Sequence, residues 1–194
     1  MKKEDYMERT LVLVKPDGVE RALIGKVIGT FEEAGLKVVA MKMVKVTKEF
    51  VGKHYIVDKV WMENMGKKTI ASYEAKGLKM NETPLEIGTR VRGYLLEYLS
   101  ENPVVAIVVE GSDAVSIVIK LAGSTEPRKA EPSTIRGRYS SDSNSLADEQ
   151  KRAARNVIHI SDSKESAEKE IRLWFKESEI FGYKRADEGA MFLQ

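Results

Sequence analysis

Cysteine is absent from the 194-residue sequence, and histidine occurs only twice. The lack of cysteine excludes disulfides, thiolate metal sites and a cysteine nucleophile, and it suits a reducing environment. Long hydrophobic runs are also missing, since no stretch approaches the roughly 20 apolar residues that a membrane-spanning helix needs. The first eight residues are polar and mixed in charge, without the apolar centre of a secretory signal. We therefore expect a cytoplasmic protein.

A strong charge of one sign is missing as well. The 32 Lys and Arg residues nearly balance the 30 Asp and Glu residues, which leaves a net charge of +2 at pH 7. Such a balance does not demand nucleic acid, so a nucleic-acid-binding module has only the mild basic excess and the Lys-rich stretch after residue 62 in its favour. Hydrophobic residues make up 42% of the chain, which is enough for a core. We expect one domain spanning residues 1–194.

The spacing of apolar residues predicts alternating strands and helices. The predicted strands are 9–14, 36–46, 104–109 and 157–158. The predicted helices are 23–31, 48–61, 95–102, 114–121 and 164–175. Four short strands with uneven connections favour an α+β fold, namely a ferredoxin-like (split β-α-β) antiparallel four-stranded sheet with flanking helices, over a doubly wound sheet.

Turn and cap residues mark the borders of these elements. Lys15-Pro16-Asp17-Gly18 predicts a turn after the first strand, because proline lacks an N–H and glycine tolerates unusual backbone angles. Gly35 suits the position just after a helix. Thr47 and Asp113 are expected to cap the helices that follow them.

Two polar segments interrupt the alternation. Residues 62–92 are rich in Lys and contain Gly66, Gly77, Pro84 and Gly88, so they break the helical pattern. Residues 139–150 are also polar. We expect both segments to be surface insertions, and we expect residues 124–139 between two helices to form a long loop of the kind that often carries function.

The candidate residue for chemistry is His159, at the end of the short apolar run Val157-Ile158. Asp162 and Glu165 form a capping-box pattern, which predicts that a helix begins directly after it. The N–H groups at a helix start favour anions, phosphate above all, so an imidazole beside them could meet a phosphoryl group. The alternative is a histidine with a structural role at a strand end.

Other residues could assist such an imidazole. Lys15 and Arg136 could neutralise phosphate charge, Thr125 could donate a hydroxyl hydrogen bond, and Glu170 could lie back from the helix to hold the second ring nitrogen. Each could equally be an ordinary surface or turn residue. Because the chain has no cysteine and no Ser-centred elbow motif to activate, the histidine would itself be the covalent group. Walker and protein-kinase glycine motifs are absent from the sequence.

Several short motifs follow one another in a fixed order along the chain. They are Lys15-Pro16-Asp17-Gly18, His54-Tyr55, Glu110-Gly111, Thr134-Ile135-Arg136-Gly137, and Asn156-Val157-Ile158-His159 with Ser161-Asp162-Ser163. In this order they resemble the nucleoside diphosphate kinase family over most of the chain. The resemblance implies an enzyme that uses nucleoside triphosphates and diphosphates as substrates, with a homo-oligomeric assembly for which a hexamer is favoured over a tetramer or dimer.

The resemblance also implies a mechanism and a set of residues. The γ-phosphate of a triphosphate would be carried on His159 and passed to a diphosphate by a ping-pong route, with Glu170 supporting the histidine. Mg²⁺ would be the cofactor, held mainly by the nucleotide phosphates and without protein metal ligands. The residues expected to bind the nucleotide are Lys15, Tyr55, Thr125, Arg136, Asn156 and Ser161.

Two positions depart from the family pattern and bear on activity. Ile119 occupies the place of an arginine that contacts phosphate, with Lys120 next to it. Ile160 replaces the glycine that follows the histidine, and its β-branched side chain is expected to crowd the site. These departures keep an alternative open, a nucleotide-binding regulatory protein whose kinase activity is weakened or lost.

Overall fold

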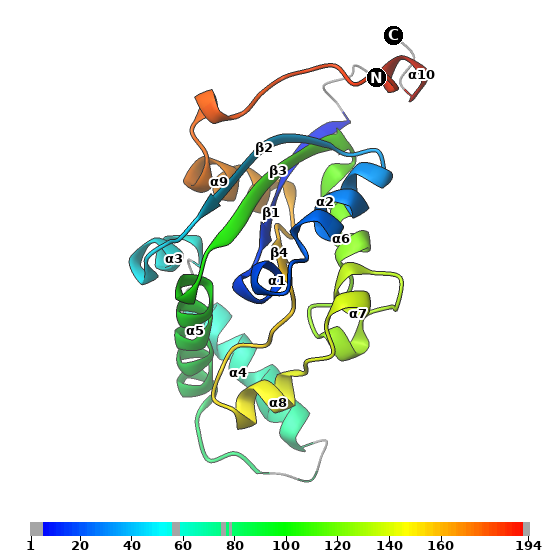
Figure 1. The fold of residues 1–194 in the computed structure, drawn as a ribbon. Coiled ribbons are helices and arrows are strands. Elements are labelled where there is room, and N and C mark those ends of the chain that lie inside the picture. The colour runs from blue at the N-terminus through cyan, green and yellow to red at the C-terminus, as the bar shows by residue number, and fades with distance from the viewer. Residues whose placement is uncertain (1–5, 56–58, 75–76, 78, 192–194) are drawn as a thin grey trace. The chain divides into compact units, whose positions relative to one another are not determined.

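A computed structural model describes residues 6–55, 59–74, 77 and 79–191 (Figure 1). The chain divides into two compact units. The first, here called the sheet unit, comprises Met1–Val44, Pro103–Asp142 and Arg155–Gln194, and the second, the helical unit, comprises Lys45–Asn102 and Ser143–Ala154. Each unit is described by itself.

The sheet unit is built on four antiparallel strands (Figure 1). They lie in the order β2-β3-β1-β4, which places the first strand of the chain between the third and the fourth. This order confirms the predicted ferredoxin-like split β-α-β sheet. The strands are β1 (Met7–Val14), β2 (Lys37–Val44), β3 (Val104–Ser112) and β4 (Ile158–Ile160).

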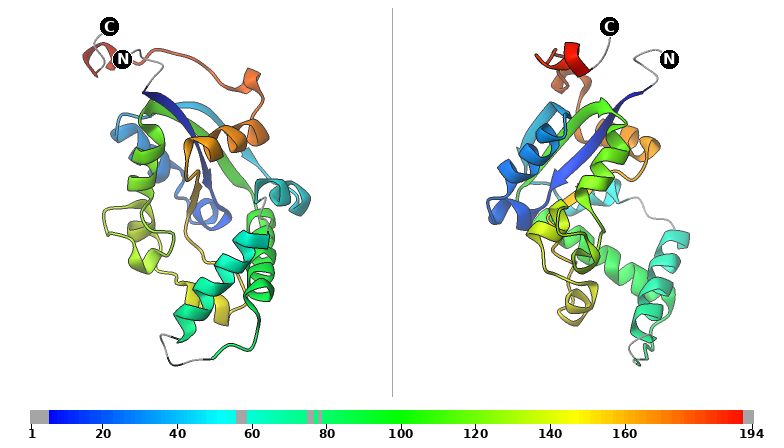
Figure 2. Two further views of the ribbon diagram at one scale, coloured as in Figure 1. Left: turned by 180° about the vertical axis from the view of Figure 1, so that it is seen from behind. Right: turned by 90° about the vertical axis from the view of Figure 1, so that its right-hand side faces the viewer.

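Helices cover both faces of this sheet. Alternate residues of β1 and β3 form one buried cluster with residues of α2 and α6, which include Phe31 and Val118. Helix α9 packs against β1 on the opposite side from α2 (Figure 2). The helices of the unit are α1 (Pro16–Glu20), α2 (Ile24–Glu33), α6 (Ala114–Ala122), α7 (Ile135–Tyr139), α9 (Lys164–Trp174) and α10 (Glu188–Met191), with short 3₁₀ helices at Pro127–Lys129 and Glu177–Glu179.

The helical unit contains the segment that the sequence predicted to be irregular. Gly66 and Gly88 belong to two helices that pack closely, since a Cβ atom would lie 1.9 Å from the Pro84 carbonyl oxygen at Gly66 and 2.1 Å from that of Met62 at Gly88. These glycines therefore allow close helix contact and do not break helices. The helices of the unit are α3 (Lys48–His54), α4 (Lys59–Glu74), α5 (Pro84–Glu101) and α8 (Asn144–Glu149).

The expectation of irregular structure across 62–92 was thus wrong in the described residues. Thr83 begins α5 with a full capping box, in which its Oγ1 accepts from the Glu86 N–H and the Glu86 carboxylate accepts from the Thr83 N–H. Pro84 occupies the first turn, where a missing N–H costs nothing. Sequence reasoning treated this proline as a breaker, although it marks a helix start. The status of 62–92 and 139–150 as insertions in one domain stays a prediction.

Several predicted borders shift. The single helix expected over 48–61 ends at His54, and α4 begins at Lys59, while residues 56–58 lie outside the described part. Thr47 caps α3 as predicted, accepting from the Phe50 N–H at 3.2 Å. Asp113 precedes α6 in a left-handed conformation with φ 50°, and its side chain makes no cap hydrogen bond.

A C-terminal segment covers the outer edge of β2. The Phe181 N–H donates to the Val39 carbonyl at 2.8 Å, the Tyr183 hydroxyl donates to the Val38 carbonyl, and Arg185 donates to the Leu36 carbonyl. The segment therefore satisfies edge groups that would otherwise be open to pairing with another chain. None of the helices in the described part of the chain combines the length and the apolarity that crossing a membrane requires.

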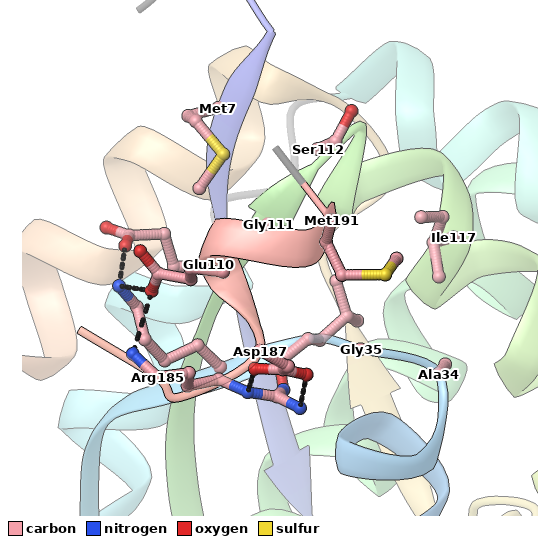
Figure 3. Close-up of a pocket in the computed structure, with 13 residues that line it drawn as sticks. Met7, Ala34, Gly35, Glu110, Gly111, Ser112, Ile117, Arg185, Asp187 and Met191 are labelled. Carbon is pink, nitrogen blue, oxygen red and sulfur yellow. Dashed lines mark hydrogen bonds and ion pairs between the residues drawn. The ribbon is translucent and has the colours of Figure 1, made fainter. Parts of the chain in front are cut away.

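A small pocket lies under this segment, and Met7, Glu110, Arg185 and Met191 are among the residues that line it (Figure 3). The Lys37 ammonium bridges Glu110 and Glu188 there, at 2.8 and 3.2 Å. Burial alone would lower the pKa of Lys37, but the hydrogen bonds and charges of the two glutamates outweigh it and raise the pKa. The pocket is at the Met7 end of β1, far along the strand from His159.

The same substitution at a buried and an exposed phenylalanine tests the assignment of the core. Phe31→Ala should lower the free energy of unfolding by about 3–5 kcal/mol, because Phe31 is fully buried and the truncation leaves a cavity. Phe181→Ala should change it by less than about 0.5 kcal/mol, because Phe181 is 65% exposed and contacts β2 through its backbone. Denaturant unfolding measures both, and equal losses would contradict the core described here.

Candidate active site

His159 occupies the centre of β4, where it pairs with Leu13 of β1. Successive residues of a strand point to opposite faces, so the imidazole faces α9 while its neighbours Ile158 and Ile160 face the core. Both isoleucines do pack in or against the core cluster. The expectation that Ile160 crowds the histidine is therefore wrong, because its side chain points away from the imidazole.

The imidazole of His159 is held by a carboxylate from α9. Its Nε2 lies 3.0 Å from Glu170 Oε2, and the Ser161 hydroxyl donates to the same oxygen at 2.6 Å. All three side chains are largely shielded from solvent. The geometry gives the ring one fixed orientation, with Nε2 directed at α9.

The start of α9 differs from the predicted capping box. Ser163 is the N-cap residue, and its Oγ accepts from the Ser166 N–H at 3.1 Å, so the cap lies one residue after Asp162. The described contact between His159 and this helix is made by the Glu170 side chain. We expected the imidazole to lie beside the N–H groups of the first turn. The contact that the structure describes is with Glu170, further along the helix.

A tight turn precedes β4. Val157 has φ 68°, and the Ile158 N–H donates to the Asn156 carbonyl at 2.7 Å, which closes a three-residue γ-turn. Positive φ is strained for a β-branched residue. The sequence placed Val157 in the strand, and it is instead the point at which the chain turns into it.

Asn156 connects two chain segments through its side-chain amide. Its Oδ1 accepts from the Lys15 ammonium at 2.7 Å, and its Nδ2 donates to the Thr125 carbonyl at 2.8 Å. Lys15 and Asn156 are buried, whereas Thr125 is exposed. The described contact of Thr125 uses its carbonyl oxygen, and the role of its hydroxyl stays a prediction.

Two cations are buried in this part of the sheet unit. The Arg136 guanidinium donates to the Gly123 carbonyl at 2.7 Å and to the Ile158 carbonyl at 3.1 Å, so it is not the exposed arginine of the alternative interpretation. Burial, and next to it the charge of Arg136, lower the pKa of Lys15 from 10.5 to about 7, although the charge of Asp17 acts in the opposite direction. Positive groups that are held out of water provide a ready environment for an anion.

Three further residues that the sequence singled out are Tyr55, Ile119 and Lys120. Tyr55 follows α3 in the helical unit, where its ring packs edge-on against His54 with centroids 4.7 Å apart. Ile119 and Lys120 are both exposed on α6 of the sheet unit. Their contributions to a site stay predictions.

Sequence reasoning missed one buried residue in this region. Asp17, assigned only to a turn, is 5% exposed and accepts a hydrogen bond from the Val157 N–H at 3.2 Å. The turn itself is the first turn of α1, with Lys15 as its N-cap residue. A carboxylate next to a proline, directly after a buried strand, was the available signal.

An imidazole that is held by a carboxylate, in surroundings that contain buried cations, is typical of enzymes that transfer phosphoryl groups. Comparison with known proteins narrows this class. The family model described as nucleoside diphosphate kinase matches residues 8–65 and 88–180. The match covers most of the chain and is interrupted between Gly66 and Ile87.

Curated relatives and solved structures agree with this match. The nucleoside diphosphate kinase of Pyrobaculum aerophilum is 42% identical over 179 residues, which cover 90% of this chain and 98% of that protein. The one from Pyrococcus furiosus is 44% identical, with 93% and 90% covered. The crystal structure of the Pyrobaculum aerophilum NDP kinase has a TM-score of 0.87 at 41% identity and covers 91% of this chain and 100% of that one.

A second solved structure is a transition-state mimic of the nucleoside-diphosphate kinase from Borrelia burgdorferi with bound vanadate and ADP. Its TM-score is 0.79 at 38% identity, with 96% of this chain and 97% of that one covered. The chain belongs to the nucleoside diphosphate kinase family, and it is an enzyme of that class.

The substitution Lys15→Met tests the burial of the ammonium. Between the folded pKa of about 7 and the ordinary value of 10.5, the unfolded chain binds a proton that the folded chain has released. The free energy of unfolding of the wild type should therefore rise with pH across this window. The variant should exceed the wild type most below pH 7, and the difference should shrink towards pH 10 in urea unfolding. A difference that stays constant would contradict the lowered pKa.

Proposed function

We propose that the enzyme transfers the γ-phosphate of a nucleoside triphosphate to a nucleoside diphosphate by a ping-pong mechanism through a phosphohistidine at His159. The observation that carries the proposal is the 3.0 Å contact between His159 Nε2 and Glu170. A carboxylate on one ring nitrogen fixes the tautomer and makes the other nitrogen more basic. Glu170 engages Nε2, so Nδ1 is the proposed nucleophile.

The two half-reactions use the same atoms in opposite directions. In the first, the Nδ1 lone pair forms a bond to the γ-phosphorus, and the bond from that phosphorus to the β,γ-bridging oxygen breaks to release the diphosphate. In the second, a terminal oxygen of the incoming diphosphate attacks the phosphorus, and the bond to Nδ1 breaks. Glu170 keeps the proton on Nε2 throughout, which stabilises the charge that develops on the ring.

We assign the buried cations to the phosphates. Lys15 and Arg136 would neutralise charge on the transferring group, which is the main demand of a loose phosphoryl-transfer transition state. Asn156 would contact the sugar side of the nucleotide, Thr125 would donate to a phosphate oxygen, and Tyr55 is a further proposed nucleotide-binding residue. The vanadate and ADP bound by the Borrelia burgdorferi relative support this class of ligand.

Ser161 is assigned to support of the histidine site. Its hydroxyl donates to the glutamate oxygen that contacts His159, at 2.6 Å. A second donor on that oxygen limits its movement, so the carboxylate keeps its direction towards the ring. The proposed nucleotide contact of Ser161 would use its remaining acceptor capacity.

Mg²⁺ is the proposed cofactor, and when bound across the phosphates it offsets part of their negative charge. The residues of the sheet unit fit a metal that is held mainly by the nucleotide. Asp17 and Glu170 each accept hydrogen bonds from protein groups, and the neighbouring charged groups Lys15 and Arg136 are cations. Such surroundings favour phosphate oxygens over a bare divalent ion.

We also propose a homo-oligomer, with a hexamer favoured over a tetramer or dimer, and a single domain with two insertions. The family membership supports the assembly. The interruption of the family match between Gly66 and Ile87 supports an insertion within 62–92.

Labelling with γ-³²P-ATP and Mg²⁺ tests the phosphohistidine. The wild type should become labelled, and the label should be lost in acid but kept in alkali, as expected for a phosphoramidate. His159→Ala should remain unlabelled. The matched control is His54→Gln, since these are the two histidines of the chain, and it should keep the label on His159.

The outcomes separate the proposal from its rival. A wild type that binds ATP without becoming labelled would contradict the mechanism and support a regulatory nucleotide-binding protein. A label that survives in His159→Ala and disappears in His54→Gln would move the nucleophile to the helical unit. Peptide mapping of the label identifies the residue in either case.

Nucleotide binding should also take up protons through Lys15. A phosphate beside the ammonium favours its charged form, so the pKa of Lys15 should rise from about 7 on binding. We expect an uptake of up to about half a proton at pH 7 and more at pH 8. Calorimetry of ADP binding in buffers of different ionisation enthalpy measures it. Lys15→Met should abolish this share of the uptake, whereas Lys120→Met, at an exposed position on α6, should retain it.

A further inference from the structure

The γ-turn at Val157 places a strained residue between two residues of the proposed mechanism. Asn156, which precedes Val157, accepts a hydrogen bond from Lys15. His159 follows Val157 by two residues. Val157 has φ 68° and is fully buried. A β-branched residue in this conformation relaxes to negative φ unless its surroundings hold it. Such a relaxation would turn the Asn156 amide and shift the start of β4.

The turn that follows β1 supplies two hydrogen bonds to Val157 and the space that its backbone needs. The Lys15 N–H donates to the Val157 carbonyl at 2.8 Å, and the Asp17 carboxylate accepts from the Val157 N–H at 3.2 Å. Gly18 leaves room, since a Cβ atom there would lie 2.9 Å from the Val157 oxygen and 2.8 Å from Val14 Cγ1. Both peptide groups of the strained residue are therefore held by one short segment.

Asp17 makes the only one of these contacts that depends on a functional group in a side chain. Lys15 contributes its backbone N–H, which any residue except proline provides, and Gly18 contributes the absence of a side chain. The Asp17 oxygen carries charge, so its hydrogen bond from the Val157 N–H is stronger than a bond between neutral groups. An exposed arginine, Arg21, lies 3.9 Å from the same oxygen.

We propose that Asp17 is a positioning residue for phosphoryl transfer, which holds the strained γ-turn at Val157 so that Asn156 and His159 keep their orientation. The proposal rests on the proposed phosphohistidine mechanism for its effect on rate, but its effect on the backbone is independent of it. The charge of Asp17 also raises the pKa of Lys15, but the positioning role is a separate one. In that role Asp17 acts through the backbone of Val157.

Single-turnover labelling separates positioning from folding. In Asp17→Ala, the rate of phosphohistidine formation should fall by about 10- to 100-fold, because a small displacement of the nucleophile costs rate. The amount of label finally reached per folded chain should stay the same. A role in folding alone would lower the final amount and leave the rate of the labelled fraction unchanged, which would overturn the proposal.

Two further variants test the physical cause. Asp17→Asn keeps an oxygen acceptor of the same shape without charge, so it should lose much less rate than Asp17→Ala. Val157→Gly removes the steric reason for strain, because glycine adopts positive φ readily. Adding it to Asp17→Ala should recover most of the lost rate, and a purely additive loss would overturn the proposed cause. Asp113→Ala, at an exposed position on the far end of the sheet unit, is the matched control and should stay within about twofold of the wild type.

A readout that does not depend on activity keeps the two proposals separate. In a crystal structure of Asp17→Ala, Val157 should leave the positive φ region, and the Asn156 side chain should lose its contact with Lys15. Unchanged backbone angles together with an unchanged rate would overturn the positioning role. A wild type without label would remove the phosphohistidine mechanism, while the backbone angles would still decide whether Asp17 holds the turn.

Discussion

The pairing of three residues of β4 with the end of β1 is the constraint on which the candidate site depends. In the observed register His159 faces α9, and Ile158 and Ile160 face the core. A slip of one residue would exchange these faces, which would bury the imidazole among apolar side chains and turn the isoleucines towards Glu170 of α9. The two large apolar neighbours of the histidine therefore specify its direction. Ile160, which replaces the glycine of the family pattern, is one of these two neighbours and so contributes to the same register.

Two of the buried cations of the sheet unit, Lys15 and Arg136, affect each other electrostatically. Lys15 and Arg136 are each held by carbonyl or amide oxygens, yet Arg136 and burial together lower the pKa of Lys15. The unliganded protein therefore keeps positive groups close together at a cost in stability. A polyphosphate would relieve that repulsion. Under the proposed function, stability is given up at this place for affinity towards the phosphates, as is common at functional sites.

Sequence patterns predicted the sheet because its strands are buried and continuous. The apolar run Val104 to Val109 and the glycine after the first helix are local signals, and the structure agrees with both. The α4–α5 pair was missed because its glycines serve the packing of one helix against the next, which the pattern within either helix does not reveal. The contact of Glu170 with His159 follows from helix length and direction, whereas the γ-turn at Val157 carries no local signal, since valine ordinarily avoids positive φ. Tertiary contacts from residues 15–18 impose that turn.

The cover on the edge of β2 has a consequence for the order of assembly during synthesis. The strands β1, β2 and β3 end by residue 112. The free edge of β1 is then paired by residues 158–160, and the free edge of β2 is covered by residues 181–185. A nascent chain therefore exposes both edges of a three-stranded sheet until residues 158–160 and 181–185 have been synthesised. The histidine arrives with the strand that closes one of these edges. The proposed nucleophile is therefore synthesised only after the three strands against which its own strand closes.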